Sequence, residues 1–370
     1  MSILILIVSL AVLILVHEFG HFVFAKKSGV RVDEFGIGFP PKLFGKKYGE
    51  TEYTVNALPF GGFVKIFGEN PDDEALHGPD KARSFINQPK TRQAAIIGAG
   101  VFFNFLLAWL LIALGFMSGM PVPVSAAPEG ALVRDARIMV TNVEKDSPAE
   151  KAGLQAGDTL LSLGASDSLL EKNISITAIQ GFIAQHGGKQ VVINYARSGK
   201  NEFTQPVTII PEAGIFGDTP AIGIAMDEIG IVKLLPHRAV FEGLRMTLSL
   251  SGAVAVSFGT LIVDAVQGNA EIQNLTGPVG IVGLIGDAAG FGIAYLFSFI
   301  AFISVNLAVL NLLPIPALDG GRLFFLLVET VKGSRLSPRF VNTAHLAGFV
   351  ALIAFMLVVT YNDIARIIAG

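Results

Sequence analysis

The sequence predicts a helical membrane protein with about four transmembrane helices, a β-hairpin on the cytoplasmic side and one inserted β-rich domain. Of its 370 residues, 52% are hydrophobic and only 15% are charged, whereas soluble domains carry about a quarter charged residues. The mean hydropathy is +0.60. The apolar residues are gathered into a few long stretches, and one polar block between them alternates as strands do.

Charge and composition also restrict what the chain can bind. The formal net charge is −3, so the sequence shows no basic footprint, and we expect no nucleic-acid partner. The chain has no cysteine, which excludes disulfides and thiolate metal ligands. Any bound metal must therefore be held by histidine, aspartate or glutamate.

Four stretches are long and apolar enough to form transmembrane helices, at about 2–24, 93–118, 292–318 and 345–368. The first is not interpreted as a signal peptide, because it lacks a basic start and a small-residue cleavage site. The loops after the first and third spans are rich in lysine and arginine, which predicts that they lie in the cytoplasm. Both termini and the block 119–291 are then expected outside.

The polar blocks contain the predicted strands. Residues 51–67 predict two strands around Pro59–Gly62, forming the cytoplasmic hairpin. Residues 130–228 predict the β-rich domain. Within it we expect strands in 137–143, 189–197 and 202–211, and a short helix, a turn and a strand in 147–164.

The first apolar stretch contains a polar cluster of His17, Glu18 and His21. On a helix the two histidines share one face, one turn apart. This is the H-E-x-x-H pattern, in which two imidazoles hold Zn²⁺ and the glutamate is the general base. Ionisable groups cost roughly 2.5–3.5 kcal/mol inside a membrane and are usually functional there. The alternatives are a satisfied polar cluster and the proton relay of a transporter.

A catalytic zinc takes three protein ligands and leaves one position open. The better candidate for the third ligand is Asp319, which follows Pro314 and Pro316 at the end of the third span. Proline breaks the helix there and frees the backbone to present a carboxylate. The alternative role of this aspartate is to cap the helix that follows. No partner at ligand spacing exists for the other histidines, His77, His186, His237 and His345.

Membrane depth connects these ligands with the orientation of residues 244–266. That stretch is apolar but rich in serine, glycine and threonine, with Arg245 and Asp264 near its ends. His21 lies near the cytoplasmic end of the first span, so Asp319 reaches the same metal only if the third span also ends there. A full crossing by 244–266 would reverse the third span. We therefore expect this stretch to lie on or partly in the membrane.

The HEFGH at 17–21 and the NLLPIPALDGG at 311–321 resemble the motifs of the site-2 protease family of intramembrane zinc metalloproteases. The type that matches best is the bacterial regulator-of-sigma-E protease, which cleaves membrane-anchored anti-sigma factors and signal-peptide remnants. The resemblance implies regulated intramembrane proteolysis of transmembrane protein substrates in the bacterial inner membrane. It implies that His17, His21 and Asp319 hold Zn²⁺ and that Glu18 is the catalytic base.

A further match to the family and the exposed hairpin edge suggest where substrate binds. GVFFN (100–104) fits its G-x-x-x-N motif, in which Gly100 allows close helix approach and Asn104 makes a polar contact near the site. Ordinary interhelical hydrogen bonding is an equal alternative for the asparagine. An unwound substrate strand could also pair with the hairpin edge and the end of the third span, through Gly61, Gly62 and Asn311.

The β-rich domain resembles a PDZ domain of the permuted bacterial kind, through SPAEKAGLQAGDTLLSLG at 147–164. PDZ domains bind an extended peptide at a sheet edge. The candidate ligand-facing strand is 220–226, with Ile222 and Gly223. A domain that acts only as a spacer or size filter is an alternative of at least equal weight. Better-known members carry two such domains in tandem, and this chain has room for one.

The sequence thus divides into four regions. Residues 1–118 hold the first two spans and the hairpin, and 119–236 form the PDZ-like extracytoplasmic domain. Residues 237–291 form amphipathic helices in contact with membrane lipid, and 292–370 hold the last two spans. Two other functions remain open: a proton-coupled transporter or channel that uses the buried His/Glu cluster, and a membrane-tethered PDZ adaptor with a peptide or protein partner.

Overall fold

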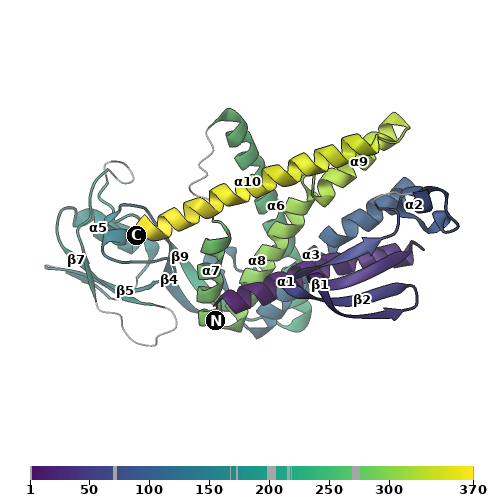
Figure 1. The fold of residues 1–370 in the computed structure, drawn as a ribbon. Coiled ribbons are helices and arrows are strands. Elements are labelled where there is room, and N and C mark those ends of the chain that lie inside the picture. Colours follow the sequence, from purple (N-terminus) through teal and green to yellow (C-terminus); the bar gives the residue numbers. More distant parts are fainter. Residues whose placement is uncertain are drawn as a thin grey trace. The chain divides into compact units, whose positions relative to one another are not determined.

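The computed structural model describes residues 2–69, 73–166, 168–171, 174–197, 206–214, 217, 219–268 and 276–369 (Figure 1). The chain divides into two compact units. The first, called here the membrane unit, comprises Met1–Ala113, Gly243–Gly286 and Phe297–Gly370. The second, the sheet unit, comprises Leu114–Glu242 and Asp287–Leu296.

Five helices in the described residues are long and apolar enough to cross a membrane. Four of them overlap the predicted spans, and the fifth contains residues 244–266. The third predicted span, 292–318, is helical only to Leu312. The length and composition of the five helices suit a crossing helix and an interfacial one alike, so the orientation of the fifth stays a prediction. The helices are α1 (Ser2–Lys27), α3 (Lys90–Ser118), α6 (Pro236–Gln267), α8 (Ile293–Leu312) and α10 (Pro338–Ala369).

The surface of α1 shows why these helices need a bilayer. No aspartate, glutamate, lysine or arginine precedes Glu18 in this helix. Its outward face exposes large apolar side chains, among them Leu4 and Val8. Exposing such surface to water costs roughly 25 cal/mol per Å², and lipid removes that cost. Lys26 and Lys27 form the last turn, where cations interact favourably with the helix dipole.

The structure contains a hairpin, but the stretch 51–67 supplies only one of its two strands. β1 (Val32–Tyr48) and β2 (Thr51–Ile66) are antiparallel and are joined by Gly49 and Glu50. The prediction of two strands separated by a turn at Pro59–Gly62 is wrong, because those residues lie inside β2.

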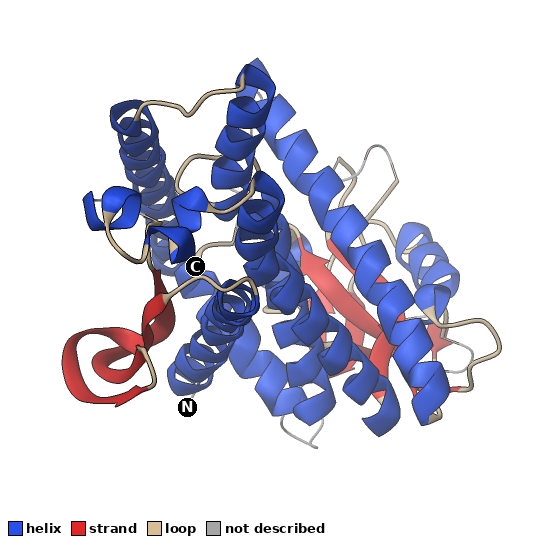
Figure 2. Ribbon diagram, turned by 90° about the vertical axis from the view of Figure 1, so that its right-hand side faces the viewer, coloured by secondary structure: helices blue, strands red, loops and turns tan. Residues whose placement is uncertain are grey.

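The residues mistaken for a turn mark a bend in a curled ribbon (Figure 2). Ile37 of β1 is paired with both Val55 and Gly62 of β2. The first part of β1 therefore lies between two arms of β2, and β2 must bend between them. A proline and two glycines suit such a bend as well as they suit a turn.

Two glycines let β2 pack closely, one on α1 and the other on β1. Gly61 has a φ of +87°, and a Cβ atom there would lie 2.7 Å from Cγ2 of Ile14. A Cβ atom on Gly62 would lie 2.7 Å from the carbonyl oxygen of Gly36. Ile14 is one helical turn before His17, so the ribbon lies against α1 beside the H-E-x-x-H pattern.

The sheet unit is built on one seven-stranded antiparallel sheet. The strand order is β3-β9-β4-β5-β7-β8, and β6 pairs with β5. The strands are β3 (Met120–Pro123), β4 (Val133–Val143), β5 (Thr159–Ala165), β6 (Ser168–Leu170), β7 (Val191–Ala196), β8 (Val207–Ile209) and β9 (Ile224–Val232).

Most of the elements predicted for this domain are confirmed. Strands lie in 137–143 and 189–197, and 147–164 contains the helix α4 (Pro148–Lys151) followed by β5. Of the strand expected in 202–211, β8 is present, and residues 202–205 lie outside the described residues.

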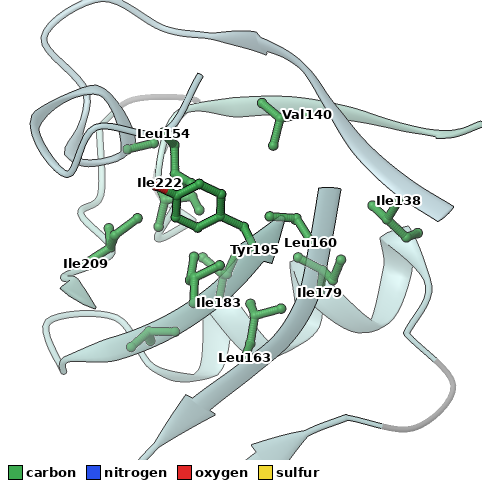
Figure 3. Packing of buried hydrophobic residues seen from close by; sticks show 13 residues of the cluster. Ile138, Val140, Leu154, Leu160, Leu163, Ile179, Ile183, Tyr195, Ile209 and Ile222 are labelled. Carbon is green, nitrogen blue, oxygen red and sulfur yellow. The ribbon is translucent and has the colours of Figure 1, made fainter. Parts of the chain in front are cut away.

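The core of the sheet unit lies between the sheet and the helix α5 (Ile176–Gln185) (Figure 3). Alternate residues of β7, Val191, Ile193 and Tyr195, are buried, as a strand with one covered face requires. They pack with Ile179 and Ile183 of α5, which lie four residues apart on one helical face.

Candidate metal centre

α1 places His17 and His21 on one buried face. Each side chain belongs to a residue that is 7% exposed. The ring centroids are 4.8 Å apart and the two Nε2 atoms are 3.1 Å apart. Both rings therefore direct the same nitrogen toward one point.

Asp319 reaches that point from the other end of the chain. It is the first residue of α9 (Asp319–Lys332), which follows the turn 313–318 after α8. Its Oδ2 lies 3.0 Å from Nε2 of His17 and 3.3 Å from Nε2 of His21. The structure thus brings together the three residues that the sequence selected as ligands.

The alternative role for Asp319, as a helix cap, does not appear in the structure. The N-cap position of α9 is Leu318, and no side chain caps the helix. The carboxylate instead points at the two imidazoles.

Glycines on α1 and α3, which have no side chain, make room for the centre. A Cβ atom on Gly100 would lie 2.4 Å from Nε2 of His21 and 2.6 Å from Cε1 of His17. A Cβ atom on Gly20 would lie 2.4 Å from the carbonyl oxygen of Ala99. The close helix approach predicted at Gly100 is therefore confirmed, and Gly20 is its counterpart on α1.

A hydrogen bond to a backbone carbonyl orients the imidazole of His21. Its Nδ1 lies 2.8 Å from the carbonyl oxygen of Ile96, which can only accept. Nδ1 therefore carries the ring proton, and the lone pair of Nε2 faces Asp319. Metal-binding histidines are commonly fixed in this way.

Asn104 performs the same task for His17. Its side-chain amide lies 3.3 Å from Nδ1 of His17, and its Oδ1 is buried without a partner in the described residues. Turning the amide by half a turn lets Oδ1 accept the Nδ1 proton, which satisfies both groups and frees Nε2. Ser304 of α8 anchors the backbone of Asn104 through a 2.8 Å bond to its carbonyl.

The donor set fits a divalent cation. The ligand atoms of His17, His21 and Asp319 all lie within 4.8 Å of one another. Oδ2 of Asp319 is buried and has no hydrogen-bond donor among the described residues. Burying a carboxylate oxygen without a partner costs free energy, and a bound cation would remove that cost. Two imidazoles and one carboxylate are a recurrent catalytic zinc set that leaves a position open for water.

Glu18 lies beside this centre, half-buried on the neighbouring face of α1. It is close enough for its charge to interact with His17, His21 and Asp319. That position suits a group that handles a proton without being a ligand.

The residues expected to bind substrate are dispersed. Asn104 lies within the centre, and Asn311 is half-buried in the last turn of α8. Gly61 and Gly62 are used in the packing of the ribbon described above. Ile222 belongs to the sheet unit, where 98% of its surface is buried.

The sheet unit has a groove of about 290 Å³ between α5 and residues 219–226. Ile183 of α5 faces it, and Ile222, Gly223, Ile224 and Met226 line its other side. Residues 220–223, expected in a strand, precede β9, because Gly223 has a φ of +81° and breaks the extended chain.

Several contacts of the centre could not be found by reading the sequence. Ser304, Gly20 and the carbonyl of Ile96 belong to no spacing rule that links them to a histidine. Only the small-residue content of the helices hinted that backbones come close.

Comparison with known proteins agrees with this geometry. The family model for peptidase family M50 matches residues 5–355. A protein of Clostridium acetobutylicum, provisionally named a zinc metalloprotease, is 33% identical over 364 residues, covering 98% of this chain and 97% of that protein. The zinc metalloprotease RasP of Geobacillus kaustophilus is 30% identical over 447 positions, covering 99% and 98%.

The chain is also similar to the regulator of sigma-E protease RseP of Escherichia coli. The two are 29% identical over 454 positions, which cover 98% of each chain. The alignment is longer than the 370 residues of this chain, so that relative contains stretches without a counterpart here. With a family match over most of its length and a histidine-carboxylate centre in its membrane unit, this chain belongs to peptidase family M50, as a zinc metalloprotease of the site-2 type.

Proposed function

We propose that this protein cleaves membrane-spanning segments of other proteins inside the bilayer, with Zn²⁺ held by His17, His21 and Asp319. The observation that carries the proposal is the meeting of these three side chains, from opposite ends of the chain, at one buried point. A proton-coupled transporter or an adaptor would need no carboxylate of α9 at the histidine pair.

Bound zinc supplies a water of lowered pKa and polarises the scissile carbonyl. Glu18 accepts the proton of the attacking water on its carboxylate and then passes it to the leaving nitrogen. Ile96 and Asn104 keep the two imidazoles in the tautomer that presents Nε2. The surrounding apolar helices exclude bulk water, which strengthens each of these electrostatic interactions.

The substrate must present an extended backbone. A transmembrane helix hides its peptide bonds in i→i−4 hydrogen bonds, so it must unwind locally and pair its freed groups elsewhere. Within the described residues, residues 62–66 of β2 pair with β1 along one edge and with no strand along the other. We propose that an unwound substrate adds to this edge as a strand, close to Gly61, Gly62 and Asn311.

We further propose single-span membrane proteins of the anti-sigma type and signal-peptide remnants as substrates, in a bacterial inner membrane. The similarity to a regulator of sigma-E protease supports this class. The sheet unit would then lie on the extracytoplasmic side, with its groove open to a peptide or with the unit acting as a size filter.

Removing residues 130–228 separates these two roles of the sheet unit. A size filter predicts that the shortened protein cleaves substrates that still carry a bulky external domain. A peptide-binding role predicts that bulky substrates stay uncleaved and that a groove-filling Ala221→Trp change alters selectivity. Unchanged selectivity in both variants would leave the unit only a spacer.

The catalytic assignment is tested by measuring zinc content and cleavage in the same preparations. We expect one zinc per chain in the purified protein and loss of that zinc in His21→Ala. Glu18→Gln should keep the zinc and lose cleavage, because the amide cannot accept the proton. A Glu18→Gln protein with normal cleavage would refute the role of Glu18.

A further inference from the structure

The turn that presents Asp319 has an unusual backbone. Ala317, two residues before the carboxylate, has a φ of +82°, a left-handed conformation that residues other than glycine adopt only when the surroundings impose it. A residue in that conformation needs neighbours that hold it in place.

One such neighbour is His345, on α10. The backbone N–H of Ala317 donates a 2.8 Å hydrogen bond to Nδ1 of His345. The ring of Phe325 packs edge-on against the imidazole, with centroids 5.4 Å apart. The imidazole is therefore fixed from one side by α9 and bound to the turn on the other.

The next turn of α10 comes close to the same segment. A Cβ atom on Gly348 would lie 2.2 Å from the carbonyl oxygen of Pro316. Gly348 follows His345 by three residues, so both lie on one face of the helix. On the face that meets the turn, α10 thus carries a histidine and a glycine whose missing side chain lets the two backbones approach.

We propose that His345 is a positioning residue for Asp319. Its Nδ1 holds Ala317 in the left-handed conformation, and that conformation sets the direction in which the Asp319 carboxylate leaves α9. The inference rests on the proposed role of Asp319 as a zinc ligand. His345 itself touches neither His17 nor His21 in the described contacts, so it acts only through the turn.

The chain offers a matched pair of substitutions for this proposal. Asparagine in His345→Asn places an acceptor oxygen close to the position of Nδ1, whereas His345→Leu keeps the bulk and removes the acceptor. Leu346→Ala, at a 64% exposed neighbour on the same helix, is the control for α10 itself.

The measurement is the rate at which zinc leaves the purified full-length protein for a chromogenic chelator. We expect His345→Leu to release zinc at least about tenfold faster, since groups that orient ligands are worth 10- to 100-fold in metal affinity. His345→Asn and Leu346→Ala should stay within about threefold of the unchanged protein. Equal rates in the leucine and unchanged proteins, or equal acceleration by leucine and asparagine, would overturn the proposal.

A second variant guards against a general loss of folding. In Ala317→Gly the left-handed conformation is no longer strained, so adding His345→Leu should accelerate zinc release less than it does alone. Equal acceleration in both backgrounds would also overturn the proposal. Failure of the underlying function looks different: the unchanged protein would hold no zinc, or Asp319→Ala would keep it.

Discussion

The geometry of the centre is most sensitive to a side chain at position 100, which is glycine. Both imidazoles occupy the space where its side chain would be, with Nε2 of His21 only 2.4 Å from the position of a Cβ atom. Gly98 lies two residues earlier on the same helix, and a Cβ atom there would meet open space. The two glycines therefore differ in surroundings and share their backbone conformation.

Gly100→Ala should displace the imidazoles and lower zinc occupancy at least about tenfold. Gly98→Ala is the matched control and should leave occupancy unchanged, because alanine also favours the helix more than glycine does. Metal analysis of the two purified variants makes the comparison. Equal occupancy in both would mean that α1 and α3 are farther apart than described.

Single residues also show how much of the centre the sequence could predict. His17 and His21 follow from helical periodicity, which is local and reliable. Asp319 needed an argument about depth, because nothing local links it to α1. The partner of Asn104 could not be derived, since no spacing rule gives the rotamer of a side chain on another helix.

At the scale of elements, the ribbon of β1 and β2 is tied by ion pairs to Lys26 of α1 and to Arg83, which precedes α3. Glu50 lies in the turn between β1 and β2 and accepts hydrogen bonds from Lys26 at 2.7 Å and from Arg83 at 2.5 Å. Hydrogen bonding to Lys26 first, and then to Arg83, lowers the pKa of Glu50 below its ordinary value of 4.5. The ribbon is therefore anchored most firmly when this carboxylate is ionised.

The pKa direction sets how this anchor depends on pH. A carboxylate with a lowered folded-state pKa stabilises the fold above its unfolded pKa, and the stabilisation is lost as the pH falls through the folded value. Glu50→Gln should cost up to about 1 kcal/mol at pH 7, and the difference should shrink at pH values below 4.5. Thermal unfolding of both proteins across pH measures it, and a difference that does not shrink as the pH falls below 4.5 would contradict the anchor.

The sequence predicted a hairpin within 51–67, but that stretch is β2 alone, and β1 was not predicted. Pro59–Gly62 carries the residue types of a turn, yet a bend inside a long strand needs the same residues. The actual turn, Gly49 and Glu50, has a single glycine and gives a weaker signal. Which of the two segments reverses the chain depends on the packing against α1.

The direction of the helices constrains α6. Ile96 meets His21 while Asn104 meets His17, so α3 runs antiparallel to α1. Ser304 contacts Asn104, and the residues after α8 then reach the histidine pair, so α8 runs back along α3. If α3 and α8 both cross, the segment between them must begin and end on one side of the membrane.

Cysteine labelling tests this orientation, because the natural chain has no cysteine. Ser118→Cys, at the end of α3, and Gln267→Cys, at the end of α6, should react with an impermeant maleimide from the same side. Ser334→Cys, in the loop between α9 and α10, should react only from the opposite side. Labelling of Gln267→Cys together with Ser334→Cys would show that α6 crosses completely.

At the scale of the whole molecule, the proposed function requires the first and last parts of the chain to meet. α1 carries His17 and His21, and Asp319 follows the turn after α8, while most of the sheet unit lies between α3 and α6 in the sequence. Such an arrangement lets the inserted unit vary in size without disturbing the metal centre. The longer alignment with the E. coli relative agrees with insertions of that kind.

The coordination shell of zinc, measured by X-ray absorption on the purified full-length protein, tests the central claim most directly. We predict two imidazole nitrogens and one carboxylate oxygen at about 2.0–2.2 Å, with the carboxylate missing in Asp319→Ala. A shell without a carboxylate, or one that is unchanged in Asp319→Ala, would contradict the account.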